Sequence, residues 1–244
     1  MEVKVVIPSH KRWDRVATIM AVDKAILCVE ESQADAYRAC NKNIEVVAHP
    51  DNVIGLARKR DWILRHFGDV FMLDDDIDSL KRVYTETGEE IIVDPDQAYE
   101  VIQQTAAACS DAGFYLFGHS TAPAPLHYKS TDPIQLSGYF TGCAHGVLKG
   151  SKLWYNPDII CNEDYWISCL NAYYHRGGFK DTRFYWSQRD TFVNRGGLAE
   201  FRNNDAEEMD FRLLQKVFGA NIVSLRKNKK SLKHPFQKSL KLPF

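Results

Sequence analysis

Short apolar runs rich in β-branched residues alternate with helical patterns through the first 80 residues, and this alternation constrains the fold more than any other feature. Helical patterns cover about residues 14–20, 34–41 and 55–67. Four runs are apolar enough to be buried strands: Val3–Pro8, Ala25–Val29, Ile44–Ala48 and Val70–Leu73. Strands that alternate with helices build a mostly parallel sheet with helices on both faces. We therefore expect an α/β fold, a Rossmann-like sheet flanked by helices, in a single domain over residues 1–225.

After residue 80 the alternation becomes irregular. A proline just inside its start predicts a helix over residues 94–112, and further helices are expected at 162–174 and 205–218. Strands are expected at 114–117 and 221–225, a loop at 121–131, and two strands with a tight bend between 135 and 148. Seven Lys or Arg residues and no acid lie between Arg226 and Lys241, so residues 226–244 are expected to form a basic C-terminal tail.

The composition is that of an ordinary globular protein. With 244 residues, 45% of them hydrophobic, the chain is long enough to bury a core without disulfides. Its six cysteines show neither a CxxC pair nor zinc-ligand spacing, which indicates small buried side chains in a reducing compartment. No apolar run approaches the ~20 residues that cross a bilayer, and no signal peptide precedes Val3. These features predict a cytoplasmic protein that does not bind membranes.

Three consecutive aspartates follow the Val70–Leu73 run. Carboxylates held this close repel one another, and a divalent cation with a preference for hard oxygen ligands removes that cost. We therefore expect Asp74 and Asp76 to bind one Mn²⁺ or Mg²⁺; the alternative is a solvated acidic turn before a helix. The Pro8–Trp13 turn and the Glu30–Glu31 pair also follow strands, and ligands of open α/β sheets bind beyond such carboxyl ends.

The string GLARKRDWILRHFGDVFMLDDDID resembles the region of GT-A fold glycosyltransferases in which a helix precedes a strand ending in an Asp-x-Asp motif. The resemblance implies metal-dependent sugar transfer from a nucleotide-sugar donor, with Asp76 as the main metal ligand. It implies that Glu30 accepts a hydrogen bond from a uracil ring nitrogen, which makes UDP the expected carrier, and that His234 is a further metal ligand. The residues expected to contact the nucleotide sugar are Pro8, Ser9, His10, Arg12, Glu30, Arg58, Arg60, Asp74, Asp75 and Gly142.

A second acidic motif, Asn162–Glu163–Asp164, opens the predicted helix at 162–174. Inverting GT-A enzymes have a similar Glu-Asp pair that deprotonates the acceptor hydroxyl, so the resemblance implies Asp164 as the general base, with Glu163 as the alternative. Taken alone, acids at this position would be explained by the helix dipole. The segment SGYFTGCAHG, which contains Gly142, resembles the glycine-containing loop that shapes the sugar pocket, although three glycines are also compatible with a plain hairpin.

The stretches NEDYWISCLNAYYHRGGFKDTRFYW and NRGGLAEFR resemble the TET/JBP-associated glycosyltransferases, which include phage and base-J related enzymes that act on hydroxymethylated pyrimidines in DNA. This resemblance implies a nucleotide-binding half over residues 1–80, an acceptor half over 81–225, and a DNA acceptor. For a phage-encoded enzyme, the compartment would be the host cytoplasm.

The basic tail supports a DNA acceptor independently, because cationic side chains bind phosphates whatever the sequence. Lys229, Lys230 and Lys233 are the residues expected to contact DNA, and Trp154, Tyr155 and Trp186 are candidates for stacking on a base. The net charge of −1 opposes this interpretation, since DNA-binding proteins are usually basic overall. The tail would then be a solubilising end.

Other functions remain compatible with the sequence. A protein or a small molecule is an alternative acceptor for the sugar, and retention is an alternative to inversion. A nucleotidyltransferase would also need paired aspartates, but it usually has a glycine-rich loop after the first strand, and Pro8–Trp13 contains no glycine. A non-catalytic nucleic-acid-binding protein is the third alternative, and its DNA affinity would be indifferent to Mn²⁺ and to nucleotide sugars.

Overall fold

The computed structural model describes residues 2–123, 128–188, 200–226 and 235–243. Four parallel strands form one half of its main sheet, in the order β3-β2-β1-β4. They are β1 (Lys4–Pro8), β2 (Ala25–Glu30), β3 (Glu45–His49) and β4 (Val70–Leu73). All of them end at the same edge of the sheet, so the residues that follow β1, β2 and β4 are brought close together.

The second half of the same sheet is mixed. Beyond β4 the order continues β9-β7-β10-β5-β6, and β8 also pairs with β10. Most of these neighbours are antiparallel, while β10 runs parallel to β7. The bounds are β5 (Ile77–Arg82), β6 (Ile92–Val93), β7 (Leu116–Ser120), β8 (Ile134–Gln135), β9 (Ala144–Val147) and β10 (Phe179–Gln188). A separate antiparallel pair is formed by β11 (Val223–Leu225) and β12 (Lys238–Leu240).

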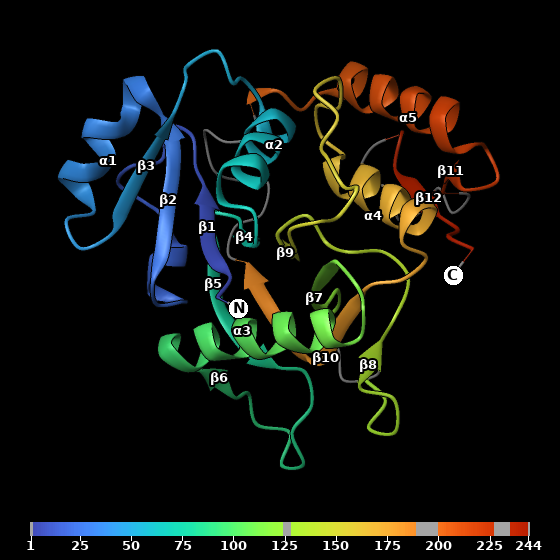
Figure 1. Cartoon of the computed structure of the whole chain (residues 1–244), viewed down its shortest axis with the longest axis horizontal. Helices are drawn as coiled ribbons and strands as arrows, with labels where there is room; N and C mark the ends of the chain where they lie inside the picture. The colour runs from blue at the N-terminus through green and yellow to red at the C-terminus, as the bar shows by residue number, and fades with distance from the viewer. Residues whose placement is uncertain (1, 124–127, 189–199, 227–234, 244) are drawn as a thin grey trace.

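Helices pack on both faces of the sheet (Figure 1). The α-helices are α1 (Ala34–Cys40), α2 (Leu56–Phe67), α3 (Pro95–Asp111), α4 (Glu163–Tyr174) and α5 (Asn204–Phe218), and two 3-10 turns, η1 (Ala17–Met20) and η2 (Glu31–Gln33), precede and follow β2. Side chains that alternate along a strand point to opposite faces. Val5 and Ile7 accordingly pack in the cluster that includes α1 and α3, whereas Val6 packs in the cluster that includes α2, α4 and α5.

The predicted α/β class, with parallel strands in the first half of the sheet and helices on both faces, is confirmed. The elements of the first 80 residues lie within a few residues of their predicted bounds, except that the helix expected at 14–20 is the single turn η1. The tail expected to begin at residue 226 contributes β12. No helix of the described residues is long and apolar enough to span a membrane.

Strand β10 was not predicted, and its sequence explains why. Its sequence FKDTRFYWSQ has neither the alternation nor the apolar run of a recognisable strand. It is nevertheless an internal strand, so Trp186 is only 2% exposed, and the buried indole N–H is satisfied because it donates to Nδ1 of His119 over 3.0 Å. The expectation that Trp186 and Tyr155 stack on a base is therefore wrong: both side chains lie in the core, and Trp154 alone of the three is exposed.

Candidate active site

A cavity of about 470 Å³ opens at the carboxyl ends of β1, β2 and β4. Helix α4 and residues 201–202 contribute its other side. Gln188, the last residue of β10, also lines the cavity, so both halves of the sheet supply lining residues. The predicted site residues that line it are Pro8, Ser9, His10, Arg12, Glu30, Asp74, Asp75, Asp76, Gly142, Glu163 and Asp164. The fold therefore brings the two acidic motifs of the sequence to one place.

The aspartate turn after β4 is held from both sides by hydrogen bonds to backbone atoms. The Thr18 hydroxyl, on η1, donates to the Asp74 carbonyl oxygen over 2.6 Å and accepts from the Ile77 amide over 2.9 Å. On the other side the Asp74 amide donates to the carbonyl oxygen of Cys143 over 2.9 Å. These contacts fix the direction in which the three carboxylates leave the sheet.

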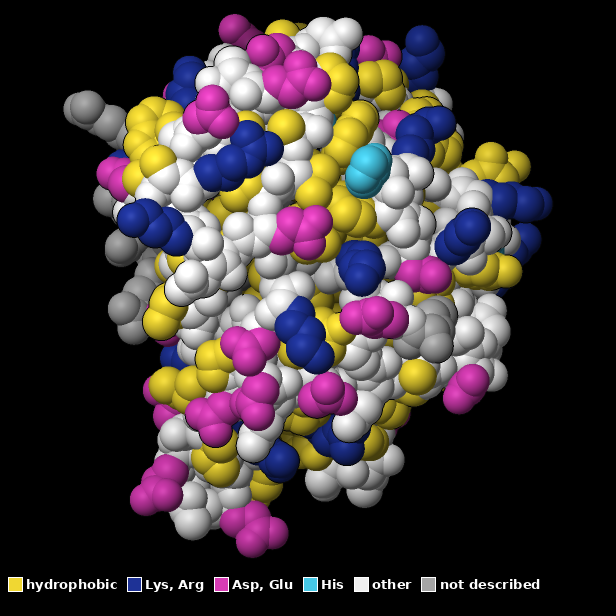
Figure 2. Space-filling model, turned by 60° about the vertical axis from the view of Figure 1, so that its left-hand side comes forward, with side chains coloured by type: hydrophobic (Ala, Val, Ile, Leu, Met, Phe, Trp, Pro, Cys, Tyr) yellow, Lys and Arg dark blue, Asp and Glu magenta, His cyan; other side chains and the backbone are white. Residues whose placement is uncertain are grey.

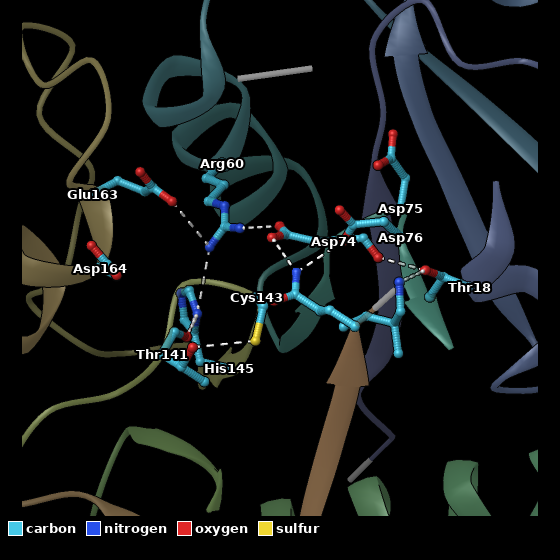
Figure 3. Close-up of polar contacts among 12 residues, drawn as sticks. Thr18, Arg60, Asp74, Asp75, Asp76, Thr141, Cys143, His145, Glu163 and Asp164 are labelled. Atoms are coloured by element: carbon cyan, nitrogen blue, oxygen red, sulfur yellow. Dashed lines mark hydrogen bonds and ion pairs between the residues drawn. The ribbon is translucent and has the colours of Figure 1, made fainter. Parts of the chain in front are cut away.

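Arg60 lies between the two acidic motifs (Figure 3). Its guanidinium is fully buried, and it contacts the Asp74 carboxylate at 2.7 Å and the Glu163 carboxylate at 3.8 Å. It projects from α2, whose basic residues the sequence analysis linked to the nucleotide, but it does not line the cavity itself. Its neighbour Arg58 is exposed and does not line the cavity either.

Asp75 points away from Arg60 toward the turn after β1. Its carboxylate accepts from the Ser9 hydroxyl and pairs with Arg12, each over 2.5 Å. Arg12 also lies 3.8 Å from the Asp76 carboxylate. The Ser9–Arg12 turn is thereby tied to the aspartate turn, and the sequence could not indicate which carboxylate would form these bonds.

Glu30, at the end of β2, is held by His10 and by the Lys59 cation. Its Oε1 atom lies 2.8 Å from Nδ1 of His10 and 3.0 Å from Nζ of Lys59. Burial raises the pKa of Glu30, but the hydrogen bond from His10 and the charge of Lys59 outweigh it and lower the pKa to about 2. The other oxygen, Oε2, is buried and has no hydrogen-bond partner among the described residues. A charged acceptor is thus left at the cavity wall.

The second acidic motif begins α4. The phenol of Tyr139 donates to Oδ2 of Asp164, and the backbone amide of Tyr165 donates to Oδ1 over 2.8 Å. Glu163 is more deeply buried, and its Oε2 has no partner among the described residues. Gly142 lies against both acids: a methyl group there would come within 3.2 Å of Asp164 and 3.3 Å of Glu163. The absence of a side chain at residue 142 lets the pair face the cavity.

Helix α5 and the C-terminal strands brace the start of α4. The buried carboxylate of Glu207 accepts from Asn162 over 3.1 Å, pairs with Lys238 on β12 over 2.6 Å, and pairs with Arg202 over 2.7 Å. Arg202 lines the cavity. The residues beyond β10 therefore position both the helix that carries the acidic pair and a cation at the cavity wall.

The carboxyl groups around Arg60 have raised pKa values. Burial raises the pKa of Asp74 and of Glu163 to about 7 against the opposing charge of Arg60, and burial likewise raises the pKa of Asp76 and Asp164. Such clustering of perturbed carboxyl groups in a cavity is typical of functional sites. It also means that a bound cation would relieve electrostatic repulsion there.

The donor set of the aspartate turn fits a hard divalent cation. Asp74 and Asp76 each direct one carboxylate oxygen toward the same atom, Nε2 of Gln188, at 3.4 and 2.9 Å. Mg²⁺ is commonly bound by one or two carboxylates together with substrate phosphates. Among the described residues, no three His, Cys, Asp or Glu side chains are arranged as a complete metal site. His234 lies outside the described residues.

Several lining residues were missed by the sequence analysis. Lys59, Thr141, Gln188 and Arg202 all line the cavity. Lys59 lies one helical turn after Gly55, on the same buried side of α2 as Ile63. A lysine on the apolar side of a predicted helix was the signal in the sequence that could have identified it. Gln188 had no such signal, because β10 itself was not recognised.

The chain matches the family model "TET-Associated Glycosyltransferase" over residues 3–197. It belongs to this family. The matched region includes both acidic motifs and ends before Arg202 and α5. Membership in this family favours sugar transfer over the nucleotidyltransferase and the non-catalytic interpretations. No curated protein sequence matches the chain.

Two solved structures resemble this chain more distantly. S. aureus TarS, residues 1–349, is 12% identical with a TM-score of 0.39; the alignment covers 75% of this chain and 60% of TarS. The mannose-1-phosphate geranyltransferase of Thermus thermophilus is 12% identical with a TM-score of 0.29, and 89% of this chain and 64% of that one are covered. The TET-associated chain thus spans less than two thirds of either structure.

Proposed function

We propose that this glycosyltransferase takes its sugar from a UDP-sugar and transfers it, with inversion, to the hydroxymethyl group of a modified pyrimidine in DNA. The observation that carries the proposal is the meeting of two acidic motifs, Asp74–Asp76 and Glu163–Asp164, in one cavity at the carboxyl ends of the strands. Transfer of a sugar from a nucleotide needs two such sites, one for the diphosphate of the donor and one for the attacking hydroxyl of the acceptor.

The β1–β2 edge is suited to the nucleoside. Glu30 presents a buried carboxylate oxygen without a partner among the described residues, and a ring N–H of uracil would satisfy it. Lys59 holds the same carboxylate and also donates to the Ser9 carbonyl oxygen over 2.5 Å, which fixes the wall on which the base would lie. We assign His10, Pro8 and Ser9 to this end of the donor.

The diphosphate would lie at the aspartate turn. Mn²⁺ or Mg²⁺ held by Asp74 and Asp76 would neutralise the charge that develops on the leaving diphosphate. Arg12, paired with Asp75, adds a cation on the same side, and Arg60 fixes the orientation of Asp74.

We assign the general base to Asp164, with Glu163 as the alternative. Both acids line the cavity, but Asp164 is the more exposed of the two, and Tyr139 orients its carboxylate. Glu163 has the unpartnered oxygen, but it is deeply buried and lies against Arg60. The base must come within hydrogen-bond reach of the acceptor hydroxyl, so exposure favours Asp164.

The DNA acceptor is supported by the resemblance of the sequence to the TET/JBP-associated glycosyltransferases and by the basic residues near the C-terminus. Lys229, Lys230 and Lys233 lie outside the described residues. On the face shown in Figure 2, Lys and Arg side chains are interspersed with Asp and Glu side chains. Affinity for phosphates on that face would therefore be offset by neighbouring acids.

The donor site can be tested by thermal unfolding with nucleotide sugars in the presence and absence of Mn²⁺. A donor present at 100 times its Kd stabilises by about 2.7 kcal/mol, which raises the Tm of a chain this size by about 5–11 °C. We expect a Mn²⁺-dependent shift with a UDP-sugar and none with Asp76→Ala. A shift that is independent of Mn²⁺, or absent with every UDP-sugar, would contradict the proposed donor.

The acceptor and the base can be tested by transfer to oligonucleotides that contain hydroxymethylcytosine or hydroxymethyluracil. Asp164→Asn should bind donor normally and lose transfer, while Glu163→Gln should retain measurable transfer. Asp158→Asn, an exposed acid just before α4, is the matched control. Normal transfer by Asp164→Asn would reassign the base, and the anomeric configuration of the product distinguishes inversion from retention.

A further inference from the structure

Gln188 reaches the aspartate turn from the far half of the sheet. It is the last residue of β10, and its side-chain amide donates to Oδ1 of Asp76 over 2.9 Å and to Oδ2 of Asp74 over 3.4 Å. Strands β4 and β10 are not neighbours, since β9 and β7 lie between them in the sheet. The amide is therefore a tertiary contact that bridges two carboxylates from a distant part of the chain.

The position of that amide matches the spacing of ligands around an octahedral cation. Mg²⁺ binds oxygen at about 2.1 Å, so two adjacent ligands on the same ion lie about 3.0 Å apart. The terminal atom of Gln188 lies near this separation from both carboxylate oxygens. A half-turn of the amide exchanges Nε2 for Oε1 at nearly the same place, and an amide oxygen is a suitable ligand for Mg²⁺ or Ca²⁺ and, by the same preference, Mn²⁺.

One further observation indicates a ligand that brings hydrogen-bond donors or positive charge to this cavity. Independently of the aspartates, Glu163 presents the buried, unpartnered oxygen Oε2 at the same cavity, with only 6% of its side chain exposed. An unmatched buried acceptor indicates that the natural occupant of the cavity brings donors or positive charge.

We propose that Oε1 of Gln188 is a ligand of the divalent cation held by Asp74 and Asp76. The inference rests on the proposed metal dependence. Without the cation, the amide N–H group stands between the two carboxylates and reduces their repulsion. When the cation binds, the amide turns and presents oxygen, so the same side chain serves both states. Cation binding then links β10, at the acceptor side of the cavity, directly to the aspartate turn.

Mn²⁺ binding can be measured without turnover by following the EPR signal of the free ion, with and without UDP. Three variants are compared with the wild type: Gln188→Met, which has a similar length and no ligand oxygen, Gln188→Glu, which has only oxygens, and Asp76→Asn. Gln135→Met, at an exposed position on β8, is the matched control. Thermal unfolding in EDTA establishes that each variant folds.

Loss of groups that only orient a metal ligand weakens metal binding 10–100-fold, so loss of a ligand should cost at least tenfold. We expect Gln188→Met to weaken Mn²⁺ binding by at least that factor and Gln135→Met to leave it unchanged. Gln188→Glu should bind Mn²⁺ more tightly than the wild type, yet have a lower Tm in EDTA, because a third carboxylate replaces the amide donor.

Two other outcomes of the Mn²⁺ measurement separate a failure of this inference from a failure of the proposed function. If the wild type binds Mn²⁺, Asp76→Asn loses binding and Gln188→Met binds as well as or better than the wild type, Gln188 is a competing donor and the inference is wrong. If the wild type binds no Mn²⁺ even with UDP, both the inference and the proposed metal dependence are wrong. Should Gln188→Met fail to fold, the Gln188→Glu comparison decides: Mn²⁺ binding no tighter than that of the wild type would overturn the inference, since a carboxylate in place of a ligating amide oxygen adds a charged ligand.

Discussion

Replacement of Arg60 by Met tests how the two acidic motifs are held together. The guanidinium is fully buried and lies 2.7 Å from the Asp74 carboxylate and 3.8 Å from the Glu163 carboxylate. Methionine replaces the apolar stem of the arginine but carries no guanidinium, so Arg60→Met leaves two buried carboxylates without their shared counter-ion. Removal of one partner from a buried ion pair costs about 3–5 kcal/mol. For a chain of this size that corresponds to a Tm lowered by about 6–20 °C.

The cost should also depend on pH, with a sign fixed by the pKa values. Both carboxyls ionise near pH 4 in the unfolded chain, whereas burial raises the pKa of Asp74 and Glu163 to about 7 in the folded protein. The folded state therefore binds more protons between pH 4 and 7, and stability falls as the pH rises through that range. Arg60 lowers both pKa values, so without it they rise further and stability continues to fall above pH 7.

The magnitude follows from the linkage slope. Each carboxyl group that is protonated in the folded state but ionised in the unfolded state lowers the free energy of unfolding by at most about 1.4 kcal/mol for each unit of rising pH. Between pH 7 and 8 the difference in stability between the wild type and Arg60→Met should therefore grow by about 1–3 kcal/mol. Urea unfolding in EDTA at pH 6, 7 and 8 measures it.

Arg58→Met is the matched control, because Arg58 lies on the same helix with its side chain exposed. An exposed substitution of this kind changes stability by no more than about 0.5 kcal/mol. Two results would refute the reasoning: a cost for Arg60→Met that equals the control, or a cost that shrinks as the pH rises.

Three other variants test the proposed roles. Glu30→Gln should weaken binding of UDP roughly tenfold or more, because a charge-assisted hydrogen bond contributes about 1.5–3 kcal/mol; calorimetry with UDP measures it, and unchanged affinity would remove the uracil assignment. Gly142→Ala should keep donor binding and reduce transfer roughly tenfold, because its methyl group would displace Asp164 and Glu163 by a few tenths of an ångström; kcat for transfer reports this, and a normal kcat would contradict it. Neutralisation of Lys229, Lys230 and Lys233 together should weaken DNA binding and reduce its salt dependence by about three charges, as a salt titration would show.

The parallel half of the fold could be predicted because its information is local. The apolar runs that form β1 to β4 are short, β-branched and bounded by turns, so their period and position identify them without knowledge of their partners. The mixed half could not be predicted in the same way. Strand β10 is recognisable as a strand only through its pairing with β5, β7 and β8, and its charged residues hide it in the sequence.

The same distinction applies to the cavity. The sequence by itself determined the two acidic motifs and their positions at a strand end and a helix start, since each is set by a few adjacent residues. It also indicated that the residues after β1 and β2 would lie beside the aspartates, because parallel strands end at one edge.

Only the tertiary structure decided how these groups are held. Arg60 joins Asp74 to Glu163, and Gln188 contacts residues more than 100 positions away. Lys238 on β12 pairs with Glu207, which in turn holds the start of α4. These are contacts between side chains that are distant in sequence, and their partners depend on how the strands and helices pack. No local pattern encodes that choice, because a buried charge is stabilised only by whichever opposite charge the fold places beside it.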